Sequence, residues 1–196
     1  MHELIQIIIE EKASLFVCAI GIPPKDVVDK LHKAGIPVMN MVGHPKHVAR
    51  ALEAGVDLIC AQGGEGGGHT GDVPSSVLVP ACVDAVKGHK SSITGKPVYV
   101  VGAGAVFDGR SLAANLMWGA QAVCAHTVSI FVHQVLTDVL RSGVGTRFVA
   151  SIEAGTPKIH KELVLSCGFD DAIRTVVYSG RPMHVRRTSY IENWYV

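Results

Sequence analysis

The feature that most constrains the fold of this chain is an alternation of short apolar runs with amphipathic segments, several of which end at glycine. Runs such as 15–20 and 36–42 are apolar at nearly every position, as expected of strands buried on both faces. The segments between them carry apolar residues three and four positions apart, which is the spacing of one helix face. The chain therefore predicts a parallel β-sheet covered by α-helices. The predicted strands are 15–20, 36–42, 56–62, 96–106 and 121–124, and the predicted helices are 23–35, 45–55, 75–88 and 108–120.

Two architectures fit this alternation, an open doubly wound sheet and a closed (β/α)8 barrel. The pattern of runs and helices does not distinguish between them. A complete barrel needs about 250 residues, whereas this chain has 196. In both architectures ligands bind at the carboxyl ends of the strands, so functional residues are expected there.

The overall composition is that of a globular protein: 48% of the residues are hydrophobic, 18% are charged and the formal net charge is +1. Because no basic stripe is present, nucleic acid is not an expected partner. No apolar run reaches the roughly 18 residues of a membrane-spanning helix, and the first residues lack the signals of a secretory leader. The five cysteines are scattered, which favours reduced thiols. We therefore expect a cytoplasmic protein, with an organelle as the alternative.

Glycine is concentrated in the segment AQGGEGGGHTG, residues 61–71, directly after the third predicted strand. Glycines let a ligand approach the backbone closely and expose N–H donors, which suits a flat ring or a phosphate. His69 is a candidate general base because imidazole exchanges a proton near neutral pH; the alternative is a solvated loop residue. Glu65 is expected to be structural, accepting hydrogen bonds from nearby backbone N–H groups.

Two further small-residue turns follow later strands, GAG at 102–104 and GVGT at 143–146. Glycine turns at several strand ends favour a phosphate-bearing cofactor, because helix N-termini there add N–H donors. His44 and His47 are three positions apart, but no third ligand is placed near them. A solvated helix start is therefore favoured over a metal site, and no metal is expected.

The segment ICAQGGEGGGHTGDV resembles the signature of the FMN-dependent nitronate monooxygenases, formerly called 2-nitropropane dioxygenases. The resemblance extends over nearly the whole chain and includes GKPVYVVGAGAVFDGR, GTRFVASIEAGTPKIHKE and GRPMHVRRTSYI. It implies a (β/α)8 TIM barrel, FMN as the cofactor, and oxidative denitrification of alkyl nitronates or nitroalkanes with O2. His69 is implied to be the base that removes the α-proton of a neutral nitroalkane.

The resemblance also implies which residues hold the cofactor. Gln62 and Gly67 are implied to line the flavin, and Gly104 is implied to lie in a turn that faces it. The FMN phosphate is implied to bind at Gly145 and Thr146. A flavin fits this chemistry because a nitronate is an anion that can pass an electron to it.

The chain departs from the family pattern at its start. Family members carry three further strands before the first run seen here, so about five of the eight βα units are expected. We therefore expect residues 1–196 to form a single partial FMN-binding TIM-barrel domain. Its open strand edges and uncovered inner face are expected to favour self-association.

A second departure interrupts the motif after the fifth strand. Where the family reads AVWVGTRF, this chain has residues 125–143 inserted between AVC and VGTRF. The segment has a helix pattern, so an inserted helix is one interpretation. We favour a retained intron, because codons TGT for Cys124, TCA for Ser142 and GGG for Gly143 would place intron boundaries there, and their removal would restore the family motif with a Trp codon. Ala105 stands where the family usually has a second glycine, and it is expected to crowd that turn.

The expected function is therefore FMN-dependent oxidation of nitronates. Two alternatives remain open. The first is an FMN-dependent enoyl reductase, which would consume NAD(P)H rather than O2 with a nitronate. The second is a non-catalytic fragment from a mistaken gene model, which would bind flavin weakly or not at all.

Overall fold

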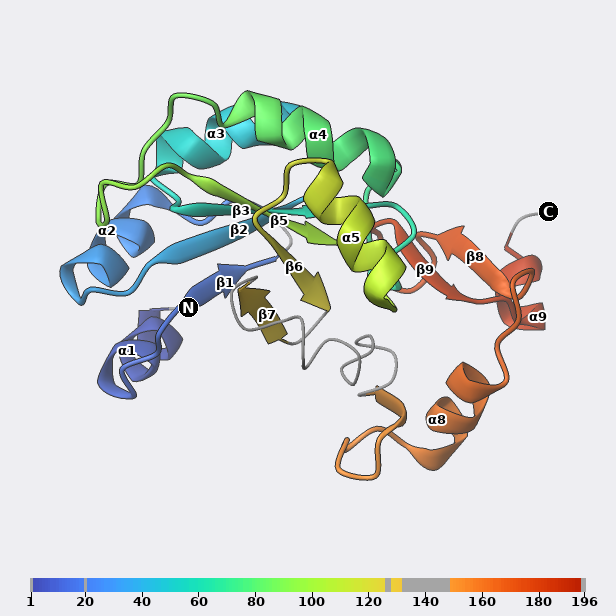
Figure 1. Ribbon diagram of the computed structural model, residues 1–196. Helices are drawn as coiled ribbons and strands as arrows, with labels where there is room; N and C mark the ends of the chain where they lie inside the picture. Colours follow the sequence, from blue (N-terminus) through green and yellow to red (C-terminus); the bar gives the residue numbers. More distant parts are fainter. Residues whose placement is uncertain (1, 20, 126–127, 132–148, 195–196) are drawn as a thin grey trace.

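A computed structural model describes residues 2–19, 21–125, 128–131 and 149–194 (Figure 1). Its centre is a six-stranded sheet with the order β1-β2-β3-β5-β6-β7. The first five of these strands pair in parallel, and β7 pairs antiparallel to β6. Each strand of this sheet lies beside its predecessor, as in a barrel, whereas a doubly wound sheet reverses its order at a switch point. The strand order is therefore that of the predicted barrel type.

The five parallel strands confirm the five predicted runs, and the four predicted helices are confirmed as well. The strands are β1 Phe16–Cys18, β2 Val38–Val42, β3 Leu58–Gln62, β5 Tyr99–Ala103 and β6 Ala122–Ala125. The helices are α2 Lys25–Lys33, α3 Lys46–Ala54, α4 Ser75–Ala85 and α5 Gly109–Met117.

The helices pack against the sheet in chain order, with α2 and α3 on β2, α4 on β3 and β5, and α5 on β6 (Figure 1). Helix α2 shows why: its apolar residues Val27, Val28 and Leu31 share one face and are buried. Helix α3 ends at Gly55, whose φ of 93° lies in the left-handed region that closes many helices. Local pattern and observed packing therefore agree for this part of the chain.

Strand β7 (Val128–Phe131) lies within the predicted insertion 125–143. It pairs with β6, Val123 lying opposite Ile130. An inserted helix is therefore wrong for residues 128–131, because their backbone groups pair with the sheet instead. The rest of the segment, 126–127 and 132–143, lies outside the described residues. The retained-intron interpretation stays a prediction, which transcript sequence across the segment will test.

A second sheet joins residues that are distant in the sequence. Its order is β4-β9-β8, and its strands are β4 Gly68–His69, β8 Ala172–Thr175 and β9 Met183–Arg186. Strands β8 and β9 form an antiparallel hairpin, and β9 also pairs antiparallel with β4. The sequence analysis did not predict this sheet. It also did not predict the helices α1 His2–Glu10, α8 Lys158–Leu165 and α9 Ser189–Glu192.

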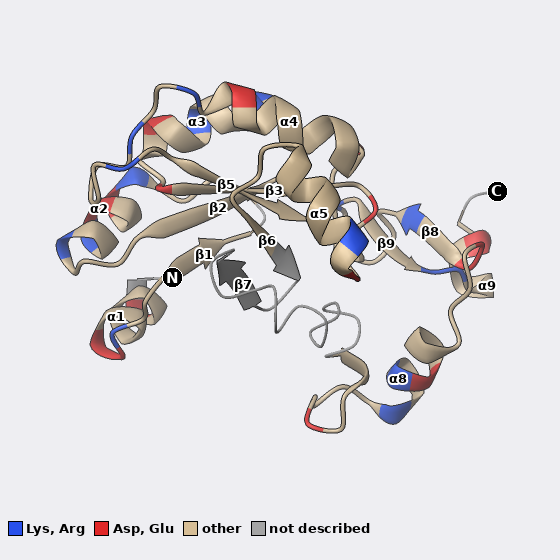
Figure 2. Ribbon diagram, viewed as in Figure 1, with Lys and Arg blue, Asp and Glu red and all other residues tan. Residues whose placement is uncertain are grey.

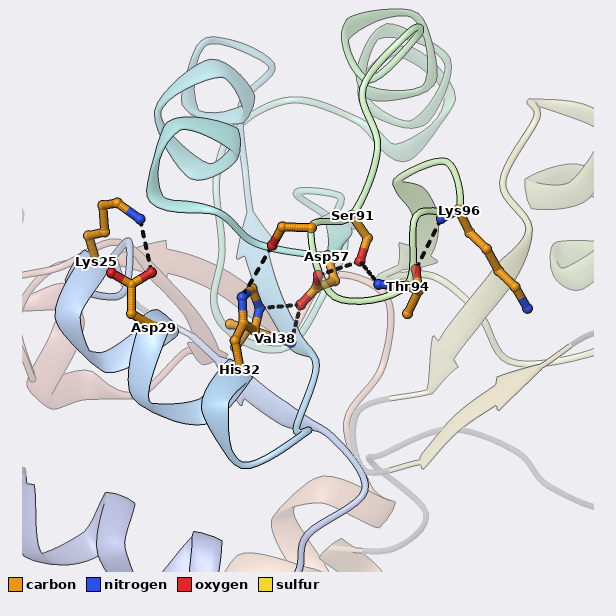
Figure 3. A network of polar contacts seen from close by, with 9 residues as sticks. Lys25, Asp29, His32, Val38, Asp57, Ser91, Thr94 and Lys96 are labelled. Atoms are coloured by element: carbon orange, nitrogen blue, oxygen red, sulfur yellow. Dashed lines mark hydrogen bonds and ion pairs between the residues drawn. The ribbon is translucent and has the colours of Figure 1, made fainter.

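The buried carboxylate of Asp57 makes polar contacts with three segments at the amino-terminal end of the main sheet (Figure 3). Asp57 is 3% exposed. One of its oxygens accepts a hydrogen bond from Val38 N–H at 2.7 Å and lies 2.8 Å from His32 Nε2. The other accepts from the Ser91 hydroxyl at 2.6 Å. Helix α2, strand β2 and the loop before β5 therefore meet at one side chain.

Charged side chains lie mainly on the helices and loops, and strands β2, β3 and β5 carry none (Figure 2). Within the described ranges, no helix is both long and apolar enough to cross a bilayer. Among the described cysteines, Cys18, Cys82 and Cys167 are free thiols. Burial raises the pKa of the Cys82 thiol to about 12, so this thiol stays protonated at neutral pH. The cellular location stays a prediction.

Candidate functional site

A cavity of about 930 Å³ lies at the carboxyl ends of β1, β2 and β3, where ligands bind in this class of fold. Its lining includes Gly21 after β1, Gly43 after β2 and Gln62 at the end of β3. His69 of β4 and Arg181, between β8 and β9, line it as well. The cavity therefore lies where the main sheet meets the small one.

The loop after β3 is fixed by Glu65, which is structural as predicted. Both carboxylate oxygens of Glu65 lie 3.1 Å from the backbone nitrogen of Ser75, and one also accepts from the Ser75 hydroxyl at 2.9 Å. Ser75 is the first residue of α4, so its N–H has no acceptor within the helix. The carboxylate supplies that acceptor, and its negative charge is favoured at a helix N-terminus.

Several loop glycines are required by contacts within the protein rather than by a ligand. A side chain at Gly104, where φ is 81°, would lie 2.9 Å from the carbonyl oxygen of Gly63. A side chain at Gly43 would lie 2.8 Å from the backbone nitrogen of Gly71. Gly67 differs, because a side chain there would meet no atom within 4 Å. Open backbone for a ligand is therefore found at Gly67 and not along the whole loop.

His69 is held by the small sheet. Its backbone pairs with Met183 of β9, and its ring Nε2 lies 2.9 Å from the hydroxyl oxygen of Ser179. That hydroxyl also donates to the carbonyl oxygen of Arg181, 3.2 Å away. The ring nitrogen that does not carry the hydrogen is the one able to accept a proton, and the tautomer decides which nitrogen that is. His69 is half-buried.

The strands of the β8–β9 hairpin and the connection between them complete the site. No local pattern in the sequence predicts this role. His184 Nδ1 donates to the carbonyl oxygen of Gly66 at 3.1 Å, across 118 positions of the sequence. The backbone N–H of Thr70 donates to the carbonyl oxygen of Pro182 at 3.3 Å. The family-like segment GRPMHVRRTSYI was the one signal in the sequence, because no local pattern encodes contacts over this distance.

The structure brings together two of the implied site residues, Gln62 and His69, which line the same cavity. Gly67 lies between them in the loop. Gly104 packs against Gly63 instead of lining the cavity. The implied phosphate-binding residues, Gly145 and Thr146, lie outside the described part of the chain.

His44 and His47 lie at the start of α3, as predicted. His44 Nδ1 accepts a hydrogen bond from the backbone N–H of Lys46 at 3.0 Å. Partial burial, followed by the charges of Lys46, His44 and Arg50, lowers the pKa of His47. Among the residues that the structure describes, no group of three His, Cys, Asp or Glu side chains could hold a metal ion.

Ala105 does not crowd its turn, contrary to the expectation from the family pattern. Its side chain is exposed, but its φ of 53° lies in the left-handed region. A residue with a Cβ atom costs about 1–2 kcal/mol in this conformation. The effect of having alanine here is therefore conformational and not steric.

The residues around the cavity fit a flavin. The Gln62 amide, which lines the cavity, offers both a donor and an acceptor. Gly67 and Gly68 leave open space beside the backbone, but neither is among the residues that line the cavity. Thr70 also lines the cavity, and its hydroxyl has no hydrogen-bond partner among the described residues. A buried hydroxyl without a partner is destabilising, and a ligand group that bonds to it removes this cost.

Comparison with known proteins places the chain in a family. The sequence profile described as nitronate monooxygenase matches residues 1–196. A nitronate monooxygenase of Neurospora crassa is 30% identical over 184 residues, which cover 85% of this chain and 42% of that protein. The (3aS,4S,5R,7aS)-5-hydroxy-7a-methyl-1-oxo-octahydro-1H-indene-4-carboxyl-CoA dehydrogenase of Mycobacterium tuberculosis is 35% identical over 170 residues, which cover 87% of this chain and 41% of that protein.

The solved structure of FabK from Thermotoga maritima has the same arrangement of elements. It superposes with a TM-score of 0.75 at 29% sequence identity, over 98% of this chain and 52% of that one. The chain thus spans about half the length of the proteins that it matches, or less. Because the family profile covers the whole chain and two curated relatives reach 30% identity or more, this chain belongs to the nitronate monooxygenase family.

Proposed function

We propose that this chain contributes the base and part of the flavin site of an FMN-dependent oxidoreductase that oxidises alkyl nitronates and nitroalkanes with O2. The observation that carries the proposal is the position of His69, which lines the cavity with Gln62 and is hydrogen-bonded to Ser179. Membership of the family supports it, as does the name of the Neurospora crassa relative.

In this proposal His69 removes the α-proton of a neutral nitroalkane, a step that a preformed nitronate does not need. The Ser179 hydroxyl, 2.9 Å from Nε2, orients the ring, and the ring nitrogen without a hydrogen accepts the proton. A base positioned in this way contributes about 10²–10⁴-fold to a reaction rate. Bound FMN would supply the electron acceptor and the oxygen chemistry.

The cofactor roles follow the same proposal. Gln62 and Gly67 would line the flavin ring, and the turn at Gly104 would support the loop from beneath. Gly145 and Thr146 would hold the phosphate. The fit rests on the Gln62 amide and on the Thr70 hydroxyl, which has no partner among the described residues, and not on the glycines as a group.

The test is His69→Asn, which keeps a polar side chain and removes the base. The variant is made in a reconstructed enzyme that has the family's three further strands before β1, lacks residues 125–143 and carries Cys124→Trp. With FMN supplied, its O2 uptake with a neutral nitroalkane should fall about 10²–10⁴-fold, and uptake with the preformed nitronate should fall much less. Ser179→Ala should give a smaller loss on the nitroalkane, because the base remains but is less well oriented. Equal losses on both substrates would mean that His69 positions the ligand and is not the base.

A second candidate is an FMN-dependent reductase or dehydrogenase that acts on a thioester. It is favoured by the cavity itself, which carries more positive charge than a small nitronate needs. The Mycobacterium tuberculosis relative, named for a CoA compound, supports it. Oxidation of NAD(P)H in the absence of O2, with reduction of the C=C bond of an enoyl thioester, would identify a reductase of this kind.

A further inference from the structure

Three permanent cations line the cavity beside His69: Lys46, Arg50 and Arg181. None of them forms an ion pair with a carboxylate in the described ranges. Asp72 is the one carboxylate among the described lining residues, and it is already paired with Arg174. The cavity therefore carries an excess of positive charge that the described protein does not neutralise.

Two separate elements bring these cations together. Lys46 and Arg50 are one turn apart on α3, where Figure 2 shows basic residues, and Arg181 comes from the connection of the β8–β9 hairpin. The close packing of Gly43 against Gly71 joins the segment before α3 to the loop that carries His69. All three residues are exposed, so solvent and salt screen their mutual repulsion and their charged groups are accessible to an anion.

The effect of this charge on a neighbouring group is visible at His47. After partial burial, the charges of Lys46, His44 and Arg50 are what lowers its pKa. A positive potential of this kind disfavours another cation and favours an anion. The preferred occupant is therefore an anion carrying more than one negative charge.

We propose that this cavity binds the phosphate groups of a phosphorylated substrate or co-substrate, in an inference that rests on the proposed flavin-dependent function. Arginine and lysine are the residues that bind phosphate most often, through charge-assisted hydrogen bonds. A nitronate carries one negative charge and a nitroalkane none, so neither uses three cations. The phosphate of FMN is expected at Gly145 and Thr146 and does not account for them either.

Two molecules supply this chemistry to a flavin enzyme, a nicotinamide dinucleotide and a coenzyme A thioester. Both carry a diphosphate between an adenosine part and an arm that ends in the reactive group, and NADPH and coenzyme A carry a further phosphate on the adenosine ribose. With the phosphates at Lys46, Arg50 and Arg181, the reactive end lies in the same cavity as His69 and Gln62. The shared feature is the phosphate group, and binding experiments separate the two sources.

The experiment measures binding of NADPH, of coenzyme A and of inorganic pyrophosphate to the purified chain by isothermal titration calorimetry. In the variant Lys46→Gln/Arg50→Gln, the Kd of at least one organic ligand should rise about 10- to 100-fold, because two charge-assisted contacts are lost. Arg181→Gln, on a separate element, should weaken the same ligand. The matched control Lys33→Gln/Lys90→Gln removes two exposed cations near the opposite ends of the strands, and it should change Kd less than about twofold.

Each outcome decides the proposal. Selective weakening of NADPH identifies a dinucleotide, selective weakening of coenzyme A identifies a thioester, and weakening of both confirms the shared phosphate site. The proposal is overturned if neither ligand binds, or if all the variants bind as the original chain does.

A parallel FMN titration tests the phosphate site and the proposed flavin-dependent function separately. Loss of FMN in the Lys46→Gln/Arg50→Gln variant would assign the cations to the flavin phosphate and overturn the proposal. Charge-dependent ligand binding without any FMN binding would instead contradict the flavin-dependent function alone.

Discussion

Ala105 has a backbone conformation that favours glycine over alanine. Its φ of 53° is left-handed, and its side chain is exposed on the turn after β5. Ala105→Gly should raise the free energy of unfolding by up to about 1 kcal/mol, because relief of the left-handed conformation exceeds the added entropy of the unfolded chain. Urea unfolding measures this.

The matched control for that variant is Ala113→Gly, at an exposed position within α5. There the same change should lower stability by about 0.5–1 kcal/mol, because glycine is unfavourable inside a helix. If both variants lose stability equally, the turn at Ala105 is not strained.

His47 provides a pH-dependent prediction at the same scale. Its pKa is lowered from 6.5, first by burial and then by Lys46, His44 and Arg50. In Lys46→Gln/Arg50→Gln the pKa should rise towards 6.5 without reaching it, because the burial remains. Titration of the His47 ring by NMR measures the shift, and an unchanged pKa would show that the two charges do not act on the ring.

The lowered pKa of His47 makes the stability of the fold depend on pH, in a definite direction. Because the folded-state pKa of His47 is below the unfolded value, the unfolded chain binds more protons as the pH falls through 6.5. His47 therefore lowers the stability of the fold as the solution is acidified and has no such effect well above that pH. The double variant should lose less of its stability over the same interval.

At the scale of elements, the buried carboxylate of Asp57 connects α2, β2 and the loop before β5 (Figure 3). Asp57→Ala leaves the N–H of Val38 and the hydroxyl of Ser91 without an acceptor in a buried site. The free energy of unfolding should fall by about 3 kcal/mol, as measured by thermal or urea unfolding.

An exposed ion pair serves as the control for that loss. Asp84 pairs with Lys87 at 2.7 Å, and its side chain is 70% exposed. Asp84→Ala should therefore cost less than about 1 kcal/mol. A comparable loss in the two variants would show that the contacts of Asp57 do not hold the three segments together.

At the scale of the whole molecule, the main sheet has two edges, β1 and β7, rather than the closed ring of a barrel. Val17 of β1 is 42% exposed, which is unusual for an apolar strand residue beside an unpaired edge. We expect the chain to self-associate through such edges and to bind FMN weakly at best. Size-exclusion chromatography with flavin absorbance measures both properties.

Val17→Lys should shift the elution towards the monomer, because a charge on an edge strand opposes pairing with another chain. A monodisperse monomer that carries stoichiometric FMN would contradict this prediction. Stoichiometric FMN would also exclude the interpretation as a non-catalytic fragment, which binds flavin weakly or not at all.

The sequence by itself determined the five parallel strands and the four helices between them. A strand buried on both faces requires a continuous apolar run, and an amphipathic helix requires a fixed spacing of apolar residues. Both patterns are therefore determined by residues close together in the sequence. The structural role of Glu65 was also predictable, because a carboxylate near a helix start meets unpaired N–H groups. The same reasoning did not reach α8, whose residues are largely exposed, or strands β8 and β9, whose residues are mostly half-buried, because neither segment has a clear apolar pattern.

Only the tertiary structure decided the strand order and the completion of the site. Strand order depends on which elements become neighbours, and the apolar pattern is the same in a barrel and in a doubly wound sheet. Strand β4 is two residues long and begins with glycine, so it carries no strand signal of its own. Its pairing with β9 brings Ser179 to His69 across 110 positions of the sequence, and Arg181 to the same cavity. Such contacts arise from long-range backbone pairing, which a local pattern of residues does not specify.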